Sequence, residues 1–315
     1  MIRLMFVLAA VAALSSGRWA QAPASAPASA SGWTPPPGQL TMAIWPGTAP
    51  GEIANMPPQV NVNANGARTA AGRPYIRLTN VSTPTITLFK PTGKSTGAAV
   101  VVFPGGSYKI LSMDLEGAEV CDWLNSIGVT CVLLKYRVPD SGPYPRSAAA
   151  LQDAQRAMGL VRQHAGEWGI DPHRVGVIGF SAGAYLSAAV SNIYDKRVYD
   201  SIDAADQLSC KPDFAVVVYP GYIALAEPNF ALNPAIHPTA GAPPTFILQA
   251  EDDPVHVENS LFYFLALKNA NVPAELHIYA QGGHGYGLRP RDLPIMGGPK
   301  LVETWLHTIK VLPEN

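Results

Sequence analysis

Hydrophobic runs and amphipathic stretches alternate along most of the chain. Continuous apolar runs of strand length predict strands that are buried on both faces, and they cover 97–104, 129–136, 174–180, 213–220, 244–250 and 274–280. Hydrophobic positions spaced three or four residues apart predict helices, which fall at 114–128, 146–169, 182–192, 256–271 and 299–312. Strands that alternate with helices of this length form mostly parallel sheets with helices on both faces. The predicted fold is therefore α/β.

Two shorter hydrophobic runs precede this region. "YIRLTN" at 75–80 and "TITLFKP" at 85–91 are rich in β-branched residues and predict a hairpin at the edge of the sheet. Neither an internal repeat nor a second linker follows residue 40, so 40–315 is predicted to be a single domain. Within it, the proline-bearing segment 221–243 is long for a connection and predicts a cap or a loop that lines the substrate site.

The first residues predict export. Arg3 is followed by an apolar stretch from Leu4 to Leu14, too short to span a bilayer, and then by small residues. Residues 1–22 are therefore interpreted as a signal peptide, and 23–39, rich in Ala, Ser and Pro, as a flexible tether. The expected location is secreted or periplasmic, without stable membrane insertion. The three cysteines, Cys121, Cys131 and Cys210, allow at most one disulfide bond but do not specify it.

One serine interrupts an apolar run. In "VGVIGFSAGAYLSAAV" (175–190), Ser181 stands between Gly179 and Gly183. Such a G-x-S-x-G turn from strand to helix is typical of a nucleophile elbow, in which the serine hydroxyl is exposed at the end of the strand. A short motif of this kind is only a hypothesis until other residues support it.

Further chemistry-bearing residues follow other predicted strands. Asp252 and Asp253 come after the strand at 244–250, and His284 comes after the strand at 274–280. Because ligands of an open α/β sheet bind at the carboxyl ends of its strands, we expect these side chains to meet Ser181. His284 would take the serine proton as general base, and an aspartate would orient the imidazole. Counting back from the following helix favours Asp252 for that role, whereas counting from the strand favours Asp253; we expect Asp252 and keep Asp253 as the alternative.

Backbone amides near this edge predict an oxyanion hole. The candidate donors are the amides of Gly106, Ser107 and Ala182, since "PGGSY" follows the strand at 97–104 and Ala182 begins a helix. Three further side chains flank the predicted site and are candidates for contact with a sugar ring, with packing at a cleft rim as the alternative: Tyr108, Tyr286 and Arg289.

Composition narrows the classes of partner. With 22 basic and 23 acidic residues the net charge is −1, which gives no reason to expect nucleic acid as a partner. The sequence holds no CxxC or HExxH motif, and its seven histidines are not paired at ligand spacing, so we expect no metal and no cofactor. The expected partner is a small-molecule or oligosaccharide ester.

These motifs together resemble those of a known superfamily. "VVFPGGSYKILSMDLEG", "VGVIGFSAG", "AEDDPVHVENS" and "GGHGYGLR", with the order serine, aspartate, histidine, are similar to the α/β-hydrolase superfamily, and more closely to secreted bacterial acetyl-xylan-esterase-like proteins. The resemblance runs from "MAIWPGTAPG" to the C-terminus. Relatives often carry a third glycine where this chain has Ser107, and the acid loop here is about one residue shorter than usual.

The resemblance implies a serine esterase that removes acetyl or related acyl groups from a carbohydrate such as xylan. The alternatives are a generalist short-chain carboxylesterase and an amide hydrolase that use the same triad. A non-catalytic carbohydrate-binding protein on a hydrolase fold would need a damaged triad, yet every triad role has a candidate residue here.

Overall fold

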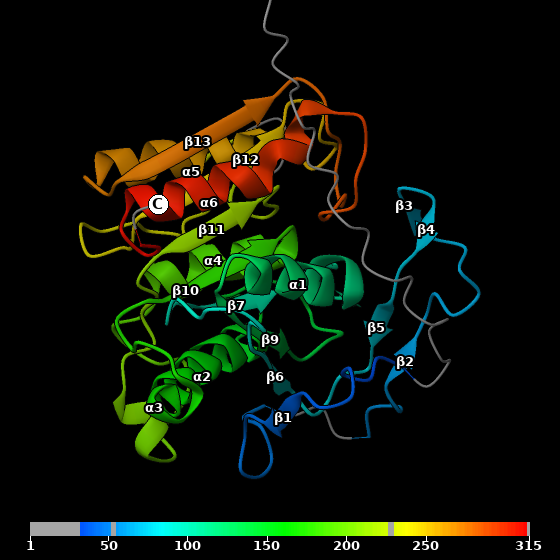
Figure 1. The fold of residues 1–315 in the computed structure, drawn as a ribbon, viewed down its shortest axis with the longest axis vertical. Helices are drawn as coiled ribbons and strands as arrows, with labels where there is room; N and C mark the ends of the chain where they lie inside the picture. Colours follow the sequence, from blue (N-terminus) through cyan, green and yellow to red (C-terminus); the bar gives the residue numbers. More distant parts are fainter. Residues whose placement is uncertain (1–31, 52–54, 226–229, 314–315) are drawn as a thin grey trace, which may run out of the picture.

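An eight-stranded sheet forms the centre of the molecule in the computed structural model, which describes residues 32–51, 55–225 and 230–313. The strands lie in the order β1-β6-β9-β7-β10-β11-β12-β13 (Figure 1). Antiparallel pairing is confined to β1–β6 and β6–β9, and all other neighbours are parallel. The bounds of the strands are β1 Leu40–Ala43, β6 Thr85–Phe89, β7 Ala99–Phe103, β9 Thr130–Lys135, β10 Val175–Phe180, β11 Ala215–Val218, β12 Thr245–Ala250 and β13 Ala274–Tyr279.

Helices cover both faces of this sheet, as the alternation of side chains along β10 demonstrates. A Cβ atom on Gly179 would lie 1.9 Å from the carbonyl oxygen of Gly183, so this face of β10 packs against α4. Ile178 and Phe180 point to the opposite face, where they share a cavity lining with residues of α1 and α6. The helices are α1 Glu119–Ser126, α2 Ala149–Gln163, α3 Ala165–Trp168, α4 Ala182–Asn192, α5 Glu258–Asn269 and α6 Gly298–Thr308.

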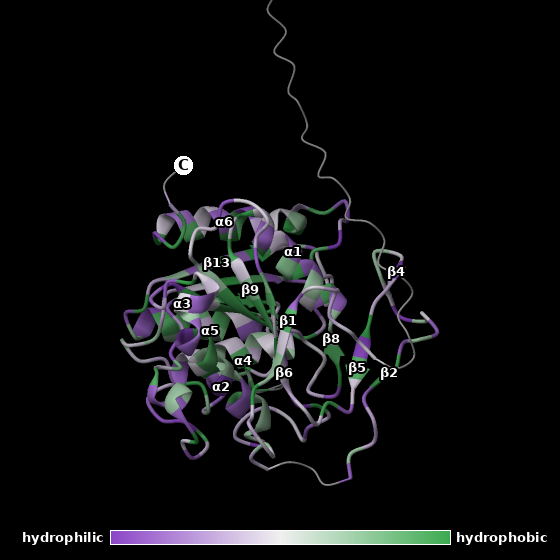
Figure 2. Cartoon of the chain, turned by 60° about the horizontal axis from the view of Figure 1, so that its bottom comes forward, coloured by the Kyte–Doolittle hydropathy of each residue, from purple (hydrophilic) through white to green (hydrophobic). Residues whose placement is uncertain are grey.

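The core consists of the continuous apolar strands that the sequence predicts. Every residue of β7, β10, β11 and β12 is buried, and Figure 2 shows hydrophobic residues concentrated in the central strands. Strands buried on both faces are typical of parallel sheets between two helical layers. The predicted α/β architecture, a mostly parallel sheet covered by helices, is confirmed.

The hairpin predicted for 75–80 and 85–91 is wrong. β6 pairs with β1 and β9 in the main sheet, whereas β5 (Arg77–Thr79) lies between β2 (Val60–Asn61) and β8 (Leu111–Ser112) in a separate sheet. β8 follows the loop that leaves β7, so this small sheet lies outside the carboxyl edge of the main one (Figure 1). A further pair, β3 (Thr69–Ala70) and β4 (Arg73–Pro74), extends beyond it.

The described residues at the N-terminal side concern where the folded domain begins. The predicted signal peptide and most of the tether lie outside the described residues. Within the tether, Trp33 is buried at 8% exposure, so packing begins before Leu40, where the sequence predicted the domain to start. Among the described residues, no helix combines the length and the apolar composition that crossing a bilayer requires.

A disulfide bond joins Cys121 of α1 to Cys131 of β9, with 5.2 Å between their Cα atoms. It fastens the helix to the strand that follows it in the chain. Cys210 is a buried free thiol. The structure therefore specifies the pairing that the sequence left open.

Candidate active site

Ser181 stands at a sharp turn between β10 and α4. Its backbone has φ 55° and ψ −117°, a conformation that residues other than glycine rarely adopt. The two flanking positions have no room for a side chain. A Cβ on Gly183 would lie 2.0 Å from the carbonyl oxygen of Phe103, and a Cβ on Gly179 would lie 1.9 Å from that of Gly183. The turn is thus the strained strand-to-helix elbow that the G-x-S-x-G motif predicts.

The imidazole of His284 connects Ser181 to an aspartate. Ser181 Oγ lies 2.8 Å from Nε2 of His284, and Nδ1 of the same ring lies 2.9 Å from Oδ2 of Asp253. The side chain of Asp253 is fully buried, and the His284 side chain is 21% exposed. With Nδ1–H donating to the carboxylate, Nε2 is left as the acceptor for the serine hydroxyl.

Asp252, the residue that the sequence favoured, does not contact the imidazole, so that prediction is corrected. Its Oδ1 accepts hydrogen bonds from the amides of Gly282 (2.9 Å) and Gly283 (2.7 Å). Asp253 instead accepts the Val255 amide on Oδ1 at 2.7 Å, which turns its Oδ2 toward His284. Both aspartates therefore act on the histidine loop, Asp252 through its backbone and Asp253 through the ring.

Asp253 is itself held by a side chain that sequence reasoning missed. Nε2 of Gln249 donates to Oδ2 of Asp253 at 3.0 Å, and Oε1 of Gln249 accepts the Ser260 hydroxyl at 2.6 Å. Gln249 is completely buried in β12. The sequence does offer a signal for this residue, because it places a glutamine in an apolar strand that ends beside the two aspartates. A buried glutamine amide needs hydrogen-bond partners, so a partner near the aspartates could be expected.

The three predicted oxyanion donors belong to the two segments that adjoin the nucleophile, the loop after β7 and the start of α4. A Cβ on Gly105 would lie 2.9 Å from the Cβ of Ser181, so the loop after β7 adjoins the elbow. Gly106 has φ 140°, and its carbonyl accepts the amides of Lys109 and Ile110. Within the described chain, the amides of Gly106, Ser107 and Ala182 donate to no protein acceptor, which leaves them available to an anionic oxygen.

The three side chains considered for sugar contact are buried, which favours the packing alternative. Tyr108 is 1% exposed and donates to the Ala182 carbonyl at 3.0 Å, and Tyr286 is 4% exposed. Arg289 is 3% exposed and forms ion pairs with Glu119 and Asp114, which tie the histidine loop to the start of α1.

Tyr222 is the exposed aromatic residue that sequence reasoning missed. It is 39% exposed, and the amide of the preceding Gly221 donates to the Ser181 carbonyl at 3.4 Å, which places Tyr222 beside the elbow. Its ring packs against those of Tyr108 (5.8 Å) and Tyr185 (6.4 Å). It belongs to the segment 221–243, of which 226–229 lie outside the described residues. The available signal was that Tyr222 lies in the loop that leaves the carboxyl end of β11.

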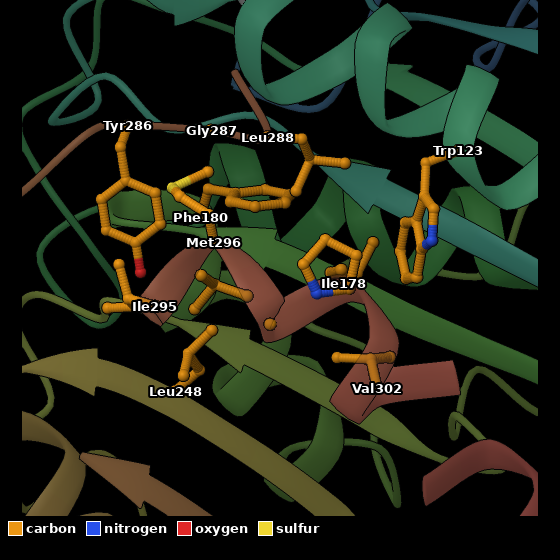
Figure 3. A pocket seen from close by; sticks show the side chains of 13 residues that line it. Trp123, Ile178, Phe180, Leu248, Tyr286, Gly287, Leu288, Ile295, Met296 and Val302 are labelled. Carbon is orange, nitrogen blue, oxygen red and sulfur yellow. The ribbon is translucent and has the colours of Figure 1, made fainter. Parts of the chain in front are cut away.

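An apolar cavity lies behind the site, between the sheet and α6. Its volume is about 20 Å³, and its lining includes Phe180, Leu248 and Val302. Figure 3 shows the Tyr286 hydroxyl pointing toward Ile295 in this lining. Such a volume accommodates no more than a water molecule, so the cavity is not the substrate site.

Comparisons with known proteins agree with this geometry. A family model described as an alpha/beta hydrolase fold matches residues 100–230. The chain is similar to an acetyl ester-xyloside bifunctional hydrolase from Caldicellulosiruptor lactoaceticus, whose crystal structure aligns over 87% of this chain and 97% of its own. The sequence identity is 32% and the TM-score is 0.67. The chain belongs to the alpha/beta hydrolase family. A thermophilic esterase from Thermogutta terrifontis, 22% identical with a TM-score of 0.63 over 74% of this chain and 90% of its own, shares the fold.

Curated relatives of this hydrolase match over shorter regions. An acetylxylan esterase from Xylanibacter ruminicola is 32% identical over 214 residues, which are 63% of this chain and 43% of that protein. A carboxylesterase from Mycobacterium tuberculosis is 25% identical over 67% of this chain and 73% of its own. The chain thus spans less than half the length of the Xylanibacter esterase.

Proposed function

We propose that this hydrolase is a serine esterase that removes acetyl groups from acetylated xylan or its oligosaccharides. One observation carries the chemistry: a single imidazole lies 2.8 Å from Oγ of Ser181 and 2.9 Å from the buried carboxylate of Asp253. This arrangement supplies a nucleophile, a base and a group that stabilises the charged base.

Acylation follows from these contacts. Oγ of Ser181 attacks the ester carbonyl carbon while its proton moves to Nε2 of His284, and Asp253 stabilises the resulting imidazolium. The carbonyl oxygen becomes an oxyanion that accepts hydrogen bonds from the amides of the Gly106–Ser107 turn and of Ala182. When the intermediate collapses, the C–O bond to the sugar breaks and Nε2 gives its proton to the departing sugar oxygen, which leaves as a hydroxyl.

Deacylation repeats these steps with water. Nε2 of His284 takes a proton from a water molecule, whose oxygen attacks the acyl carbon of the ester on Ser181. The second tetrahedral intermediate collapses with transfer of the proton to Oγ of Ser181, and acetic acid leaves. The enzyme returns to its starting state, with no cofactor consumed.

Two observations support a sugar ester as substrate. The similarity to an acetylxylan esterase and to an acetyl ester-xyloside hydrolase favours acetylated xylosides. In addition, the exposed ring of Tyr222 beside the Ser181 elbow offers a flat aromatic surface on which a pyranose ring can stack.

Export to the periplasm or the medium is part of the same proposal. The apolar stretch from Leu4 to Leu14 has the length of a signal-peptide core. The disulfide between Cys121 and Cys131 suits an oxidising compartment. Cell fractionation with N-terminal sequencing tests this: the proposal expects the mature protein outside the cytoplasm, and an uncleaved cytoplasmic chain would contradict it.

The activity is tested by acetate release from acetylated xylo-oligosaccharides, with a chromogenic acetate ester as reference and Ser181→Ala as control. We expect both substrates to be hydrolysed by the wild type and neither by the variant. Turnover of the chromogenic ester alone would point to a general carboxylesterase instead. If the folded wild type hydrolyses neither, the proposal is wrong.

A further inference from the structure

A buried carboxylate outside the triad connects the two halves of the active site. Glu116 lies in the π-helical turn η1 (Asp114–Ala118) that precedes α1, and it is 2% exposed. Its Oε2 accepts the amide of Gly105 at 2.8 Å, and its Oε1 accepts the hydroxyl of Tyr219 at 2.8 Å. Gly105 begins the oxyanion loop and Tyr219 directly follows β11, so Glu116 touches both sides of the catalytic centre.

Tyr219 carries this connection on to the histidine loop. Its hydroxyl, which donates to Glu116, accepts the amide of Gly287 at 3.1 Å. Its ring packs edge-on against the imidazole of His284, with 5.0 Å between the centroids. Burial and the nearby Glu116 charge raise the pKa of the Tyr219 hydroxyl well above its usual value, so the phenol stays protonated and donates. One chain of hydrogen bonds thus runs from the oxyanion loop to the loop of the general base.

We propose that Glu116 acts as a carboxylate to position the oxyanion loop through Gly105 and to position and electrostatically support His284 through Tyr219. This role rests on the proposed esterase function. In this role Glu116 touches no substrate atom; it is a positioning residue. It bonds to the hydroxyl of Tyr219, whose ring packs against the imidazole that becomes an imidazolium during catalysis, so its negative charge acts in the same direction as that of the triad aspartate.

The electrostatics of the cluster agree with an interaction between Glu116 and His284. Burial raises the pKa of the Glu116 carboxyl above its usual value, and the Tyr219 hydroxyl, the charge of His284, the Gly105 amide and the Ser112 side chain offset only part of that increase. The interaction is reciprocal, so an ionised Glu116 stabilises the protonated imidazole.

Other groups face the same ring or its loop and remain unchanged in the test below. Asp253 contacts Nδ1, and Asp252 holds the loop backbone. Tyr286, on the same loop, packs against Tyr219 at 4.6 Å, and Arg291 lies over the Tyr286 ring at 5.6 Å.

The test compares Glu116→Gln with the wild type in two measurements. NMR titration of the His284 ring, assigned by its loss in His284→Asn, reports the charge without requiring turnover. We expect the titration midpoint of this ring to fall in Glu116→Gln, because the variant lacks the negative charge that stabilises the imidazolium. The kcat for the chromogenic acetate ester is expected to fall by roughly 10- to 100-fold, with KM changed by less than about twofold.

Two further variants separate positioning from a general loss of stability. Tyr219→Phe keeps the ring but removes the hydroxyl, and we expect it to lower kcat while the protein stays folded. Asp122→Asn removes one carboxylate from an exposed position of the neighbouring helix α1 and is expected to leave both measurements unchanged.

The outcomes are distinct. A folded Glu116→Gln protein with an unchanged His284 titration and a wild-type kcat overturns the inference, even when the wild type is a good esterase. A full kcat in Tyr219→Phe overturns the connection through Tyr219. If Glu116→Gln does not fold, the kcat of Tyr219→Phe decides whether the hydrogen-bond chain through Tyr219 positions the catalytic residues. An inert wild type refutes the proposed function, whereas a His284 titration that shifts as expected would still support the charge interaction.

Discussion

Asp253 Oδ2 lies 2.9 Å from Nδ1 of His284, and its side chain is completely buried. The adjacent Asp252 accepts two backbone amides of the histidine loop instead. Two neighbouring carboxylates thus have separate tasks: one orients the imidazole and stabilises its cation, and the other fixes the loop that carries it.

Replacing Asp253 with asparagine is expected to remove most of the activity. An amide at this position donates to Nδ1 or forces the wrong tautomer, so Nε2 no longer accepts the serine proton. We expect kcat to fall on the order of 10³- to 10⁴-fold, with KM nearly unchanged. Steady-state kinetics on the chromogenic acetate ester provides the measurement.

Asp252→Asn is the matched control for that variant. It weakens two charge-assisted hydrogen bonds to Gly282 and Gly283 but leaves the imidazole's partner in place. We expect a loss of kcat of about tenfold or less. If Asp252→Asn were the more damaging of the two, the assignment of Asp253 as triad acid would be wrong.

Tyr222→Ala is expected to discriminate between substrates. Loss of the exposed ring removes a stacking surface for a sugar, so KM for acetylated xylo-oligosaccharides should rise by about 5- to 10-fold. The kinetics with the chromogenic acetate ester should stay the same, because that ester has no sugar to stack. Tyr222→Trp keeps an aromatic face and serves as control. Equal losses on both substrates would contradict a role in sugar binding.

The disulfide between Cys121 and Cys131 is expected to stabilise the fold. It closes a short loop, because the cysteines are 10 positions apart in sequence, so its removal should lower the free energy of unfolding by about 2–3 kcal/mol. Denaturant unfolding of the Cys121→Ser/Cys131→Ser double variant measures this. A peptide map under non-reducing conditions checks the pairing, and a bridge to Cys210 would contradict it.

Acid should weaken an ion-pair cluster between α2 and the short helix η2 (Ala204–Gln207). Asp206 accepts hydrogen bonds from Tyr199 at 2.6 Å and Ile202 at 2.9 Å, and its Oδ1 lies 3.0 Å from Nη1 of Arg156. Burial on its own raises the pKa of Asp206, but these three partners outweigh it and the net pKa is lowered.

A lowered carboxyl pKa stabilises the folded state above the unfolded-state value of about 4, and this stabilisation is lost as pH falls through the folded-state value. Asp206→Asn should therefore unfold more easily by about 2–4 kcal/mol at pH 7. The difference from wild type should shrink below about pH 4. Thermal melts across pH provide the comparison, and a difference independent of pH would refute the explanation.

The elements that the sequence predicts well are those with a strong local pattern. β10 and β12 are long apolar runs, and their predicted bounds differ from the observed ones by one residue. β5 and β6 were misassigned because their partners, β8 and β9, lie far along the chain, and short β-branched runs do not encode which distant strand they join. The predicted helix at 114–128 begins instead with a π-helical turn, which places Glu116 against Gly105.

The candidate site was predictable to the level of loops but not of side-chain directions. Ser181 and His284 are each framed by glycines at a strand's carboxyl end, so their meeting followed from the topology. Asp252 and Asp253 differ by one position in a turn, and only the turn's hydrogen bonds, such as that from Val255, decide which carboxylate points inward. Glu116 had no such signal, because its role depends on contacts with segments over a hundred residues away, such as Tyr219.

The central claim, that Ser181 is the nucleophile activated by His284, is tested most directly by trapping the purified protein with a fluorophosphonate. Intact-mass spectrometry and peptide mapping then identify the labelled residue. We predict a single adduct on Ser181, formed slowly in His284→Asn and absent in Ser181→Ala, with loss of esterase activity in step with labelling. An adduct on another residue, or esterase activity that survives in Ser181→Ala, would contradict it.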